Sequence, residues 1–368
     1  MTAGYYFDFG VGSPPAAPYV QVLPDTLYSK ELGYGFEEGG RVSSRDRGEG
    51  DRLQSAFCIP LEAAFAVDLP NGLYNVAMTM GDAIAPTITS VTYGPRRHVV
   101  RKAATTAGQY AAHSFTVKVT DGKLRLSFGG IAPRINSLVI TEARQAFTVF
   151  LAGDSTVTDQ ETFPYAGWGQ MLPLFFKAEA AVDNHAKSGR SSRSFIDEGR
   201  LAAILEQIRP GDHLWIQFGH NDSKPDKERA TDPYTSYKEK LGVYIKEARA
   251  RQAHPLLITP MHRRKFDGQG RIIDTHGDYI PAMKELAAEL DVPLIDLAEK
   301  SRALYERYGP EPSKALFVWA YPGEFMSLPE GMEDDTHFQE AGALAIASLV
   351  VEGVRELMLP PFHLYLKN

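Results

Sequence analysis

The chain changes its hydrophobic pattern near residue 146, and this change limits the folds that it can adopt. Before that point, short apolar runs alternate with turn signals such as Pro70-Asn71-Gly72 and Asp121-Gly122. After it, apolar runs alternate with helical segments of ten residues or more. The first pattern is typical of an all-β sandwich, and the second is typical of a parallel sheet with helices on its faces. We therefore predict a β-sandwich over residues 1–145 and an α/β domain over residues 146–368.

The expected sandwich contains many short strands and no cluster of catalytic residue types. Residues 114–128 (SFTVKVTDGKLRLSF) are predicted to form a hairpin across Asp121-Gly122, because apolar and polar side chains alternate on both sides of that turn. Residues 33–52 are polar and rich in glycine, and they predict a long loop. A structural or docking role is expected for this domain. Its predicted strands cover 5–9, 64–69, 74–80, 114–119, 123–128 and 137–141.

The second half predicts a doubly wound sheet in three layers, α/β/α. The segment 277–290 repeats its apolar residues at the 3.6-residue period of a helix. In such sheets ligands bind beyond the carboxyl ends of the strands. The expected strands are 147–152, 180–185, 212–218, 255–260 and 292–296, and the expected helices lie near 168–178, 195–208, 233–252, 277–290, 299–307 and 339–357.

Charge and composition exclude several classes of protein. The 368 residues carry a net charge of −7, which argues against a nucleic-acid or anionic-membrane partner. No apolar run approaches the roughly 20 residues that span a bilayer. The first residues lack the pattern of a secretory signal, so a cytoplasmic location is expected. Cys58 is the one cysteine, which excludes an internal disulfide and cysteine-rich metal sites. The oligomeric state is left open.

Four short segments place polar residues where they are expected to meet. Ser155 follows the first strand of the α/β domain, Gly189 follows the second, and Asn221 follows the third. The segment from Asp334 to His337 precedes the last predicted helix, in a loop that could fold over the same edge. Three of the four segments therefore converge at the carboxyl edge of the sheet, which is where a ligand would bind.

These residue types suit nucleophilic catalysis on an ester. A serine hydroxyl becomes a nucleophile when a histidine removes its proton, and a carboxylate fixes the tautomer of that histidine. Ser155, His337 and Asp334 can fill these roles. The backbone N–H groups of Ser155 and Gly189 and the side-chain amide of Asn221 would stabilise the oxyanion. No metal and no cofactor are required.

Each piece taken alone also has a simpler interpretation. Asp334 and His337 could be a helix cap beside a surface histidine, and the glycines could serve ordinary turns. Asp335 competes with Asp334 for the carboxylate role, although the three-residue spacing to the histidine favours Asp334. His220 is left out of the catalytic set as a structural histidine.

Taken together, the four segments GDST, the Gly189 loop, GHND and DDTH resemble the sequence blocks of the GDSL, or SGNH, hydrolases. The resemblance implies Ser155 as nucleophile, Ser155, Gly189 and Asn221 as oxyanion donors, and Asp334 with His337 as the rest of the triad. It also implies a flavodoxin-like fold. The segments at 166–173, 188–195, 219–224 and 259–267 resemble the rhamnogalacturonan acetylesterase branch. The first half resembles the galactose-binding-like sandwiches found beside carbohydrate-active enzymes.

The resemblance implies a serine esterase that removes acetyl groups from a pectin-type carbohydrate. Two alternatives remain open, an esterase for another glycan or small ester and a catalytically silent carbohydrate-binding protein. Basic residues that follow Gly189 and the fourth strand of the α/β domain suggest an acidic oligosaccharide as substrate, because a planar guanidinium suits a carboxylate. Solvated loop charge is the simpler explanation for about half of these residues. The candidate substrate-binding residues are Arg190, Arg193, Arg263 and Arg264.

Overall fold

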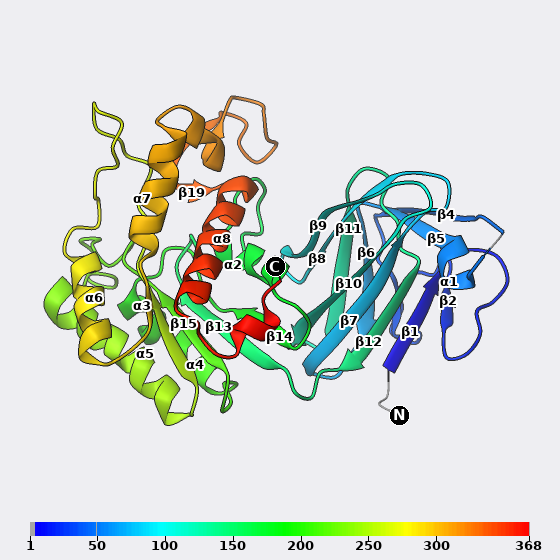
Figure 1. Cartoon of the computed structure of the whole chain (residues 1–368), viewed down its shortest axis with the longest axis horizontal. Helices are drawn as coiled ribbons and strands as arrows, with labels where there is room; N and C mark the ends of the chain where they lie inside the picture. Colours follow the sequence, from blue (N-terminus) through cyan, green and yellow to red (C-terminus); the bar gives the residue numbers. More distant parts are fainter. Residues whose placement is uncertain (1–3, 49, 368) are drawn as a thin grey trace. The chain divides into compact units, whose positions relative to one another are not determined.

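The computed structural model describes residues 4–48 and 50–367 and divides into two compact units (Figure 1). The first unit contains residues 1–146, and the second begins at Phe147, within two residues of the boundary that the sequence predicts. The short segment 176–181 and Lys367 group with the first unit. Its Glu179 accepts a hydrogen bond from the side chain of Asn75 and donates its own N–H to Thr116 Oγ1.

The first unit is a β-sandwich of two five-stranded sheets, as the sequence predicts. Side chains from both sheets form its core, and aromatic rings such as Phe9, Phe65 and Phe115 are fully buried there. One sheet has the order β10-β7-β12-β1-β2 and the other β3-β6-β11-β8-β9, while β4 and β5 form a separate ribbon. The strands are β1 Gly4–Phe9, β2 Val20–Val22, β3 Tyr34–Phe36, β4 Arg41–Asp46, β5 Ala56–Leu61, β6 Ala63–Asp68, β7 Gly72–Gly81, β8 Thr87–Tyr93, β9 Arg97–Thr105, β10 Tyr110–Val119, β11 Lys123–Gly129 and β12 Ser137–Glu142, with the short helix α1 Arg52–Ser55.

Two local predictions for the sandwich are wrong. The strands on either side of Asp121-Gly122 do not pair as a hairpin, because β10 pairs with β7 and β11 pairs with β6 and β8 in the opposite sheet. Both strands bury their apolar faces in the same core, so the turn joins the two sheets across it. The predicted long loop at 33–52 contains β3 and β4, and β4 pairs with β5.

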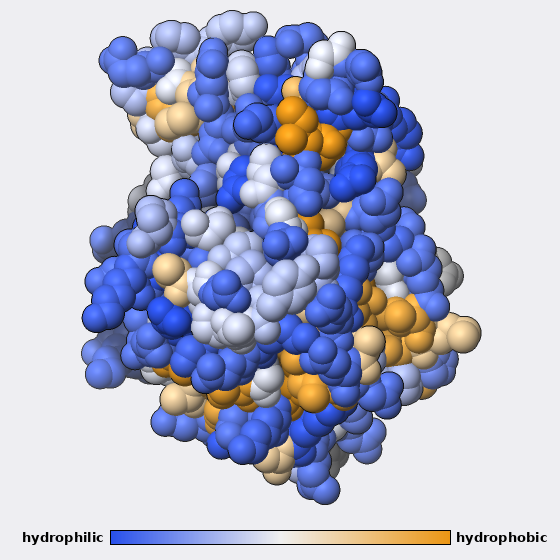
Figure 2. Space-filling model, turned by 90° about the vertical axis from the view of Figure 1, so that its left-hand side faces the viewer, coloured by the Kyte–Doolittle hydropathy of each residue, from blue (hydrophilic) through white to orange (hydrophobic). Residues whose placement is uncertain are grey.

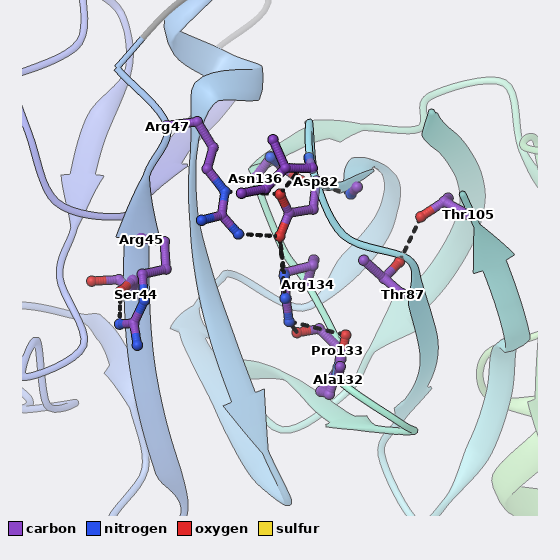
Figure 3. A network of polar contacts seen from close by, with 12 residues as sticks. Ser44, Arg45, Arg47, Asp82, Thr87, Thr105, Ala132, Pro133, Arg134 and Asn136 are labelled. Atoms are coloured by element: carbon purple, nitrogen blue, oxygen red, sulfur yellow. Dashed lines mark hydrogen bonds and ion pairs between the residues drawn. The ribbon is translucent and has the colours of Figure 1, made fainter. Parts of the chain in front are cut away.

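One end of the sandwich is held by a buried group of charges around Asp82 (Figure 3). This carboxylate is fully buried and accepts hydrogen bonds from Arg47 at 2.7 and 2.9 Å and from Arg134 at 3.2 Å. Both guanidinium groups also lie over the ring of Phe57. Burial by itself would raise the pKa of Asp82, but the hydrogen bond from Arg47 and the other donors hold that pKa below its usual range. The carboxylate therefore ties three loops of the sandwich together.

The second unit has the predicted α/β/α layers around a parallel sheet of order β14-β13-β15-β16-β17. This order is that of the flavodoxin-like folds. Phe150 and Leu214 belong to a buried cluster with side chains of α3, α4, α5 and α6 on one face. On the other face Trp215 contacts Phe362 of α9, and Gly353 of α8 lies against Ile295. The strands are β13 Phe147–Gly153, β14 Ala180–Asn184, β15 His213–Gln217, β16 His254–Ile258 and β17 Leu294–Ile295.

Most predicted helices exist, but one of them is divided in two and another is shorter than predicted. The segment expected to be one helix at 195–208 is divided by Gly199, whose φ of +73° ends the first helix. The helix expected at 168–178 is shorter and ends as a 3-10 turn, η1. The elements are α2 Trp168–Met171, η1 Leu172–Phe175, α3 Ser192–Asp197, α4 Arg200–Leu205, η2 Pro233–Tyr237, α5 Lys238–Ala250, α6 Tyr279–Glu289, α7 Leu297–Tyr308, η3 Pro312–Leu316, α8 Glu340–Glu356 and α9 Phe362–Tyr365.

A two-stranded ribbon outside the main sheet was not expected from the sequence. Its strands are β18 Phe317–Ala320 and β19 Met332–Phe338, and they pair antiparallel. The segment from Asp334 to His337, predicted as a loop, lies within β19. Figure 2 shows the face that lies on the left-hand side of Figure 1. This face is mostly hydrophilic, with separate apolar groups. Among the described residues no helix is long and apolar enough to cross a membrane.

Candidate active site

Ser155 lies directly beyond the end of β13, in a tight turn fixed by its neighbours. Asp154 is fully buried, and its Oδ1 accepts hydrogen bonds from the N–H and the hydroxyl of Thr156 at 2.9 and 2.8 Å. Gly153 is needed before the turn, because a Cβ there would lie 2.6 Å from Val157. Gln160, which the sequence analysis did not single out, donates its side-chain amide to the carbonyl of Ser155 at 2.8 Å. These contacts hold the hydroxyl of Ser155 at the carboxyl edge of the sheet.

The structure brings Ser155, His337 and Asp334 into one chain of hydrogen bonds. His337 Nε2 lies 2.8 Å from Ser155 Oγ, and His337 Nδ1 lies 2.7 Å from Asp334 Oδ2. The other carboxylate oxygen of Asp334 accepts the backbone N–H groups of Thr336 and His337 at 2.8 and 2.9 Å. The carboxylate is therefore held by the strand that carries the histidine, and it requires the tautomer with the proton on Nδ1. Nε2 is then free to accept the serine proton.

The charge on Asp334 is stabilised although the group is largely buried. Burial by itself would raise the pKa of this carboxyl, but the hydrogen bond with the His337 side chain and the two backbone donors hold the pKa below its usual range. Asp334 is therefore ionised at neutral pH and can stabilise an imidazolium on His337. The aromatic ring of Tyr165 packs edge-on against the imidazole at 6.0 Å between centroids. The sequence offered no signal for this contact.

Three N–H donors lie on the segments that surround Ser155. Among the described residues, the backbone N–H groups of Ser155 and Gly189 have no hydrogen-bond acceptor. Gly189 has a φ of +83°, a conformation that favours glycine and turns the backbone of its loop. Asn221 donates one hydrogen of its side-chain amide to the carbonyl of Arg190 at 3.1 Å, which orients the amide and leaves its second hydrogen free. Such donors can stabilise an oxyanion.

Asp335 points away from the histidine and has other partners. Its Oδ1 accepts hydrogen bonds from Arg264 Nε at 2.7 Å and from the indole of Trp319 at 2.9 Å. The Arg264 guanidinium also lies over the Trp319 ring and donates to the carbonyl of Pro310. Of the two neighbouring carboxylates, Asp334 therefore contacts the imidazole and Asp335 holds the β18–β19 ribbon. These contacts favour a structural role for Arg264 rather than substrate binding.

The other three candidate arginines differ in their partners. Arg190 pairs with Glu198 at 2.9 Å and donates to the carbonyl of Ser188. Arg193 donates a hydrogen bond to the carbonyl of Lys227 at 3.3 Å. Arg263 is half-buried and donates to Thr275 and to the carbonyl of His220 at 3.1 Å. Burial lowers the pKa of the Arg263 guanidinium. Among the described residues neither Arg193 nor Arg263 has a carboxylate partner.

Three buried histidines, His220, His276 and His262, lie next to one another, and His220 lies beside Asp154 of the serine turn. His220 Nδ1 lies 3.4 Å from the carboxylate of Asp154, and its ring packs edge-on against His276. His262, Asp274 and His276 are the one set in the described part of the chain whose ligand atoms could surround a metal ion, all within 4.8 Å. However, Arg302 donates to His262 Nε2 at 3.1 Å, which leaves the proton on Nδ1, the atom that faces Asp274. This protonation opposes metal binding by His262.

Comparisons with known proteins agree with this geometry. The family model "GDSL-like Lipase/Acylhydrolase family" matches residues 151–345, more than half of the chain. The chain belongs to this family. A second model, "Beta-agarase/YXIM esterase-like, galactose-binding domain-like", matches residues 5–130, within the sandwich. The predicted family and both predicted fold classes are thereby confirmed, and the chain is a carboxylic ester hydrolase.

Two relatives from Bacillus subtilis (strain 168) match different shares of the chain. Rhamnogalacturonan acetylesterase RhgT is 52% identical over 219 residues, which is 59% of this chain and 93% of that protein. The uncharacterized esterase YxiM is 32% identical over an alignment of 370 positions that covers 95% of this chain and 90% of that protein. The crystal structure of YxiM matches with a TM-score of 0.53 at 29% identity, covering 97% of this chain and 99% of that one. The similarity to YxiM therefore includes the sandwich.

Proposed function

We propose that this esterase removes acetyl groups from an acidic, pectin-type carbohydrate through an acyl-enzyme on Ser155. The observation that carries the proposal is the hydrogen-bonded chain from Asp334 through His337 to Ser155, with unpartnered N–H donors beside the serine. The relatives RhgT and YesY, 52% identical over 219 residues and 47% identical over 214 residues, are named rhamnogalacturonan acetylesterase and probable rhamnogalacturonan acetylesterase, which supports the choice of substrate. A silent carbohydrate-binding protein would not need this complete arrangement.

In the first half of the reaction, Ser155 Oγ attacks the carbonyl carbon of the acetyl ester while its proton moves to His337 Nε2. The carbonyl oxygen becomes an oxyanion and accepts hydrogen bonds from the N–H groups of Ser155 and Gly189 and from Asn221. The sugar oxygen then leaves and takes the proton from His337, which leaves acetyl-Ser155. In the second half, water attacks the acetyl carbonyl, gives one proton to His337, and releases acetate as the proton returns to Ser155.

Recognition of an acidic sugar is assigned to the arginines without a carboxylate partner. Arg263 is half-buried and, among the described residues, bonds only carbonyl and hydroxyl oxygens, so no carboxylate forms an ion pair with it, although the charge of Asp154 acts on it from a distance. It donates to the carbonyl of His220, the residue before Asn221, and this places it close to the candidate oxyanion hole. A uronic acid carboxylate would supply the missing negative charge through a charge-assisted hydrogen bond. Arg193 is the second candidate.

The nucleophile is tested by replacing Ser155 with alanine. The variant should release no measurable acetate from an aryl acetate, while its unfolding temperature stays close to that of the wild type. Mass spectrometry of the wild-type enzyme quenched during turnover should show one added acetyl group, and the Ser155→Ala protein should show none. Residual turnover in the alanine variant would refute the role of Ser155.

The substrate is tested by comparing acetate release from acetylated rhamnogalacturonan oligosaccharides and from acetylated xylan, at matched acetyl concentration. We expect faster release from the acidic substrate, and a smaller preference at high salt because salt screens a partly exposed ion pair. Arg263→Gln should raise KM for the acidic substrate more than for a neutral aryl acetate. Arg200→Gln is the matched control, because Arg200 already pairs with Glu198. Equal rates on both polymers would refute the pectin assignment and leave the esterase assignment intact.

A further inference from the structure

Asp222, the last residue of the GHND motif, is a buried carboxyl group that the proposed reaction does not use. It is fully buried, and its Oδ1 accepts the N–H of Ser192 at 3.0 Å, the hydroxyl of Ser192 at 2.5 Å and the hydroxyl of Thr231 at 3.3 Å. Its backbone carbonyl accepts the hydroxyl of Tyr279 at 3.1 Å. Every one of these contacts lies inside the second unit.

The partners of Asp222 connect two of the segments that supply oxyanion donors. Ser192 begins α3, three residues after Gly189, and Asp222 directly follows Asn221. A second link runs parallel to the first, because the amide of Asn221 donates to the carbonyl of Arg190. Tyr244 strengthens the joint from α5 by donating to the carbonyl of Ser192 at 2.9 Å. The distance between the Gly189 and Asn221 donors is therefore fixed by two adjacent cross-links.

We propose that Asp222 is a positioning residue of the oxyanion hole, whose carboxyl group joins the Gly189 segment to the Asn221 segment. The inference rests on the proposed function, because it assumes that Gly189 and Asn221 stabilise the oxyanion. Asp222 acts through these donors and does not contact the substrate itself. Without it, the N–H and hydroxyl of Ser192 would lose their acceptor in a buried site, which costs enough to shift the segment.

The surroundings of Asp222 disfavour ionisation of its carboxyl group, because it is buried away from positive charge. All three donors reach Oδ1, and Oδ2 has no hydrogen-bond partner among the described residues. No lysine, arginine or histidine of the described chain forms an ion pair with it. Burial raises the pKa of the Asp222 carboxyl to about 7. The ionisable groups that face it are another acid, Asp154, and the tyrosines Tyr237, Tyr244 and Tyr279, none of which supplies a positive charge.

A neutral group at this position favours the reaction. An ionised carboxylate next to Asn221 would repel the negative charge that develops on the carbonyl oxygen. The activity should therefore decline as pH rises through the ionisation of Asp222. The asparagine side chain keeps an acceptor for Ser192 and cannot ionise, so Asp222→Asn should lack the decline.

The test measures kcat and KM of the full-length enzyme on an aryl acetate between pH 5.5 and 9. Asp222→Ala should lower kcat about tenfold to hundredfold and leave KM within about threefold, since an oxyanion donor acts in the transition state. Asp222→Asn should stay within about threefold of the wild type at pH 6. The partly exposed Asp226, paired with Arg229 in the same loop, provides the control Asp226→Asn, which should change nothing.

A double-mutant cycle separates positioning from general destabilisation. If Asp222 acts through Asn221, the loss in the double variant Asp222→Ala, Asn221→Ala should be close to that of Asn221→Ala alone. Ser192→Ala, which removes only the hydroxyl contact, supports the same cycle if Asp222→Ala does not fold. Wild-type kcat in Asp222→Ala, fully multiplicative losses, or the same alkaline decline in Asp222→Asn would overturn the inference. Inactive wild-type enzyme, or an active Ser155→Ala variant, would refute the proposed function instead.

Discussion

Replacing Asp334 with asparagine should disable the base, because both orientations of the new amide conflict with the existing hydrogen bonds. Asp334 accepts on both oxygens, from His337 Nδ1 on one side and from two backbone N–H groups on the other. If the amide oxygen of asparagine faces the imidazole, its NH₂ group faces the N–H groups of Thr336 and His337. If it is reversed, the NH₂ group donates to Nδ1 and moves the imidazole proton to Nε2.

The two backbone bonds decide between these orientations. If the asparagine NH₂ group faced the two backbone N–H groups, three donors would be left without an acceptor, at a cost of about 1–3 kcal/mol for each buried group left unpaired. The reversed orientation is therefore favoured, and it leaves Nε2 unable to accept the serine proton. A base held in the wrong tautomer costs roughly 10⁴ in kcat in a serine triad, which corresponds to about 5.4 kcal/mol. We expect a loss of about this size for Asp334→Asn.

The matched control is the neighbouring carboxylate. Asp335→Asn keeps an oxygen for Arg264 or Trp319 and does not face the imidazole, so kcat should fall by less than about tenfold. The assay is the initial rate on an aryl acetate, with thermal unfolding measured for both variants. A rate for Asp334→Asn above a tenth of the wild type, or a larger loss for Asp335→Asn than for Asp334→Asn, would refute the assignment of the acid.

Three further predictions concern the oxyanion hole and the sandwich. Asn221→Ala should lower kcat by roughly 10²–10³ with a smaller change in KM, as steady-state kinetics would show; a change in KM alone would point to uniform substrate binding. Asp82→Ala should lower the unfolding free energy of the sandwich by about 3–5 kcal/mol in urea titrations, since it leaves Arg47 and Arg134 without their carboxylate. The control Glu37→Ala, at the exposed Arg125 pair, should cost under about 1 kcal/mol, and similar losses in both variants would contradict the prediction. Burial raises the pKa of Asp8 to about 6, so its contribution to stability is full below about pH 4 and is lost as pH rises through 6. The difference in unfolding free energy between the wild type and Asp8→Asn should therefore fall over that pH range. A difference that does not change with pH would contradict a buried ionisation at Asp8.

The fold could be predicted where the local sequence pattern and the tertiary structure favour the same secondary structure. Apolar runs such as 147–152 are buried on both faces of a parallel sheet, so their sequence identifies them without knowledge of their neighbours. Pairing is different, because it depends on distant segments. The strands on either side of Asp121-Gly122 carry the alternation of a hairpin, yet each pairs within a different sheet. Alternation of apolar and polar residues in a strand predicts which face of the strand is buried, but it does not predict which strand lies beside it.

The candidate site shows the same division. Ser155, Gly189 and Asn221 follow predicted strands, and the edge of a parallel sheet brings them together whatever the helices do. The position of His337 on a ribbon strand could not be predicted, because β18 and β19 are held by distant contacts such as those of Asp335. The role proposed for Asp222 was also missed. An aspartate in a polar loop motif has the sequence of an exposed turn residue, and its complete burial follows only from the packing of α3, α5 and α6 around it.

The four arginines show why charge on a sequence does not by itself identify a substrate site. All four were expected at one edge of the sheet, and each could in principle face a uronate. Arg190 and Arg264 already bind Glu198 and Asp335, so a substrate carboxylate would have to displace an existing partner. Arg263 gives up hydration in a half-buried position, and its hydrogen bonds within the described chain go to neutral oxygens, so a ligand carboxylate would stabilise it more than it would stabilise either paired arginine. The absence of a carboxylate ion pair among the described residues, and not the presence of positive charge, is therefore the feature that makes Arg263 the stronger candidate.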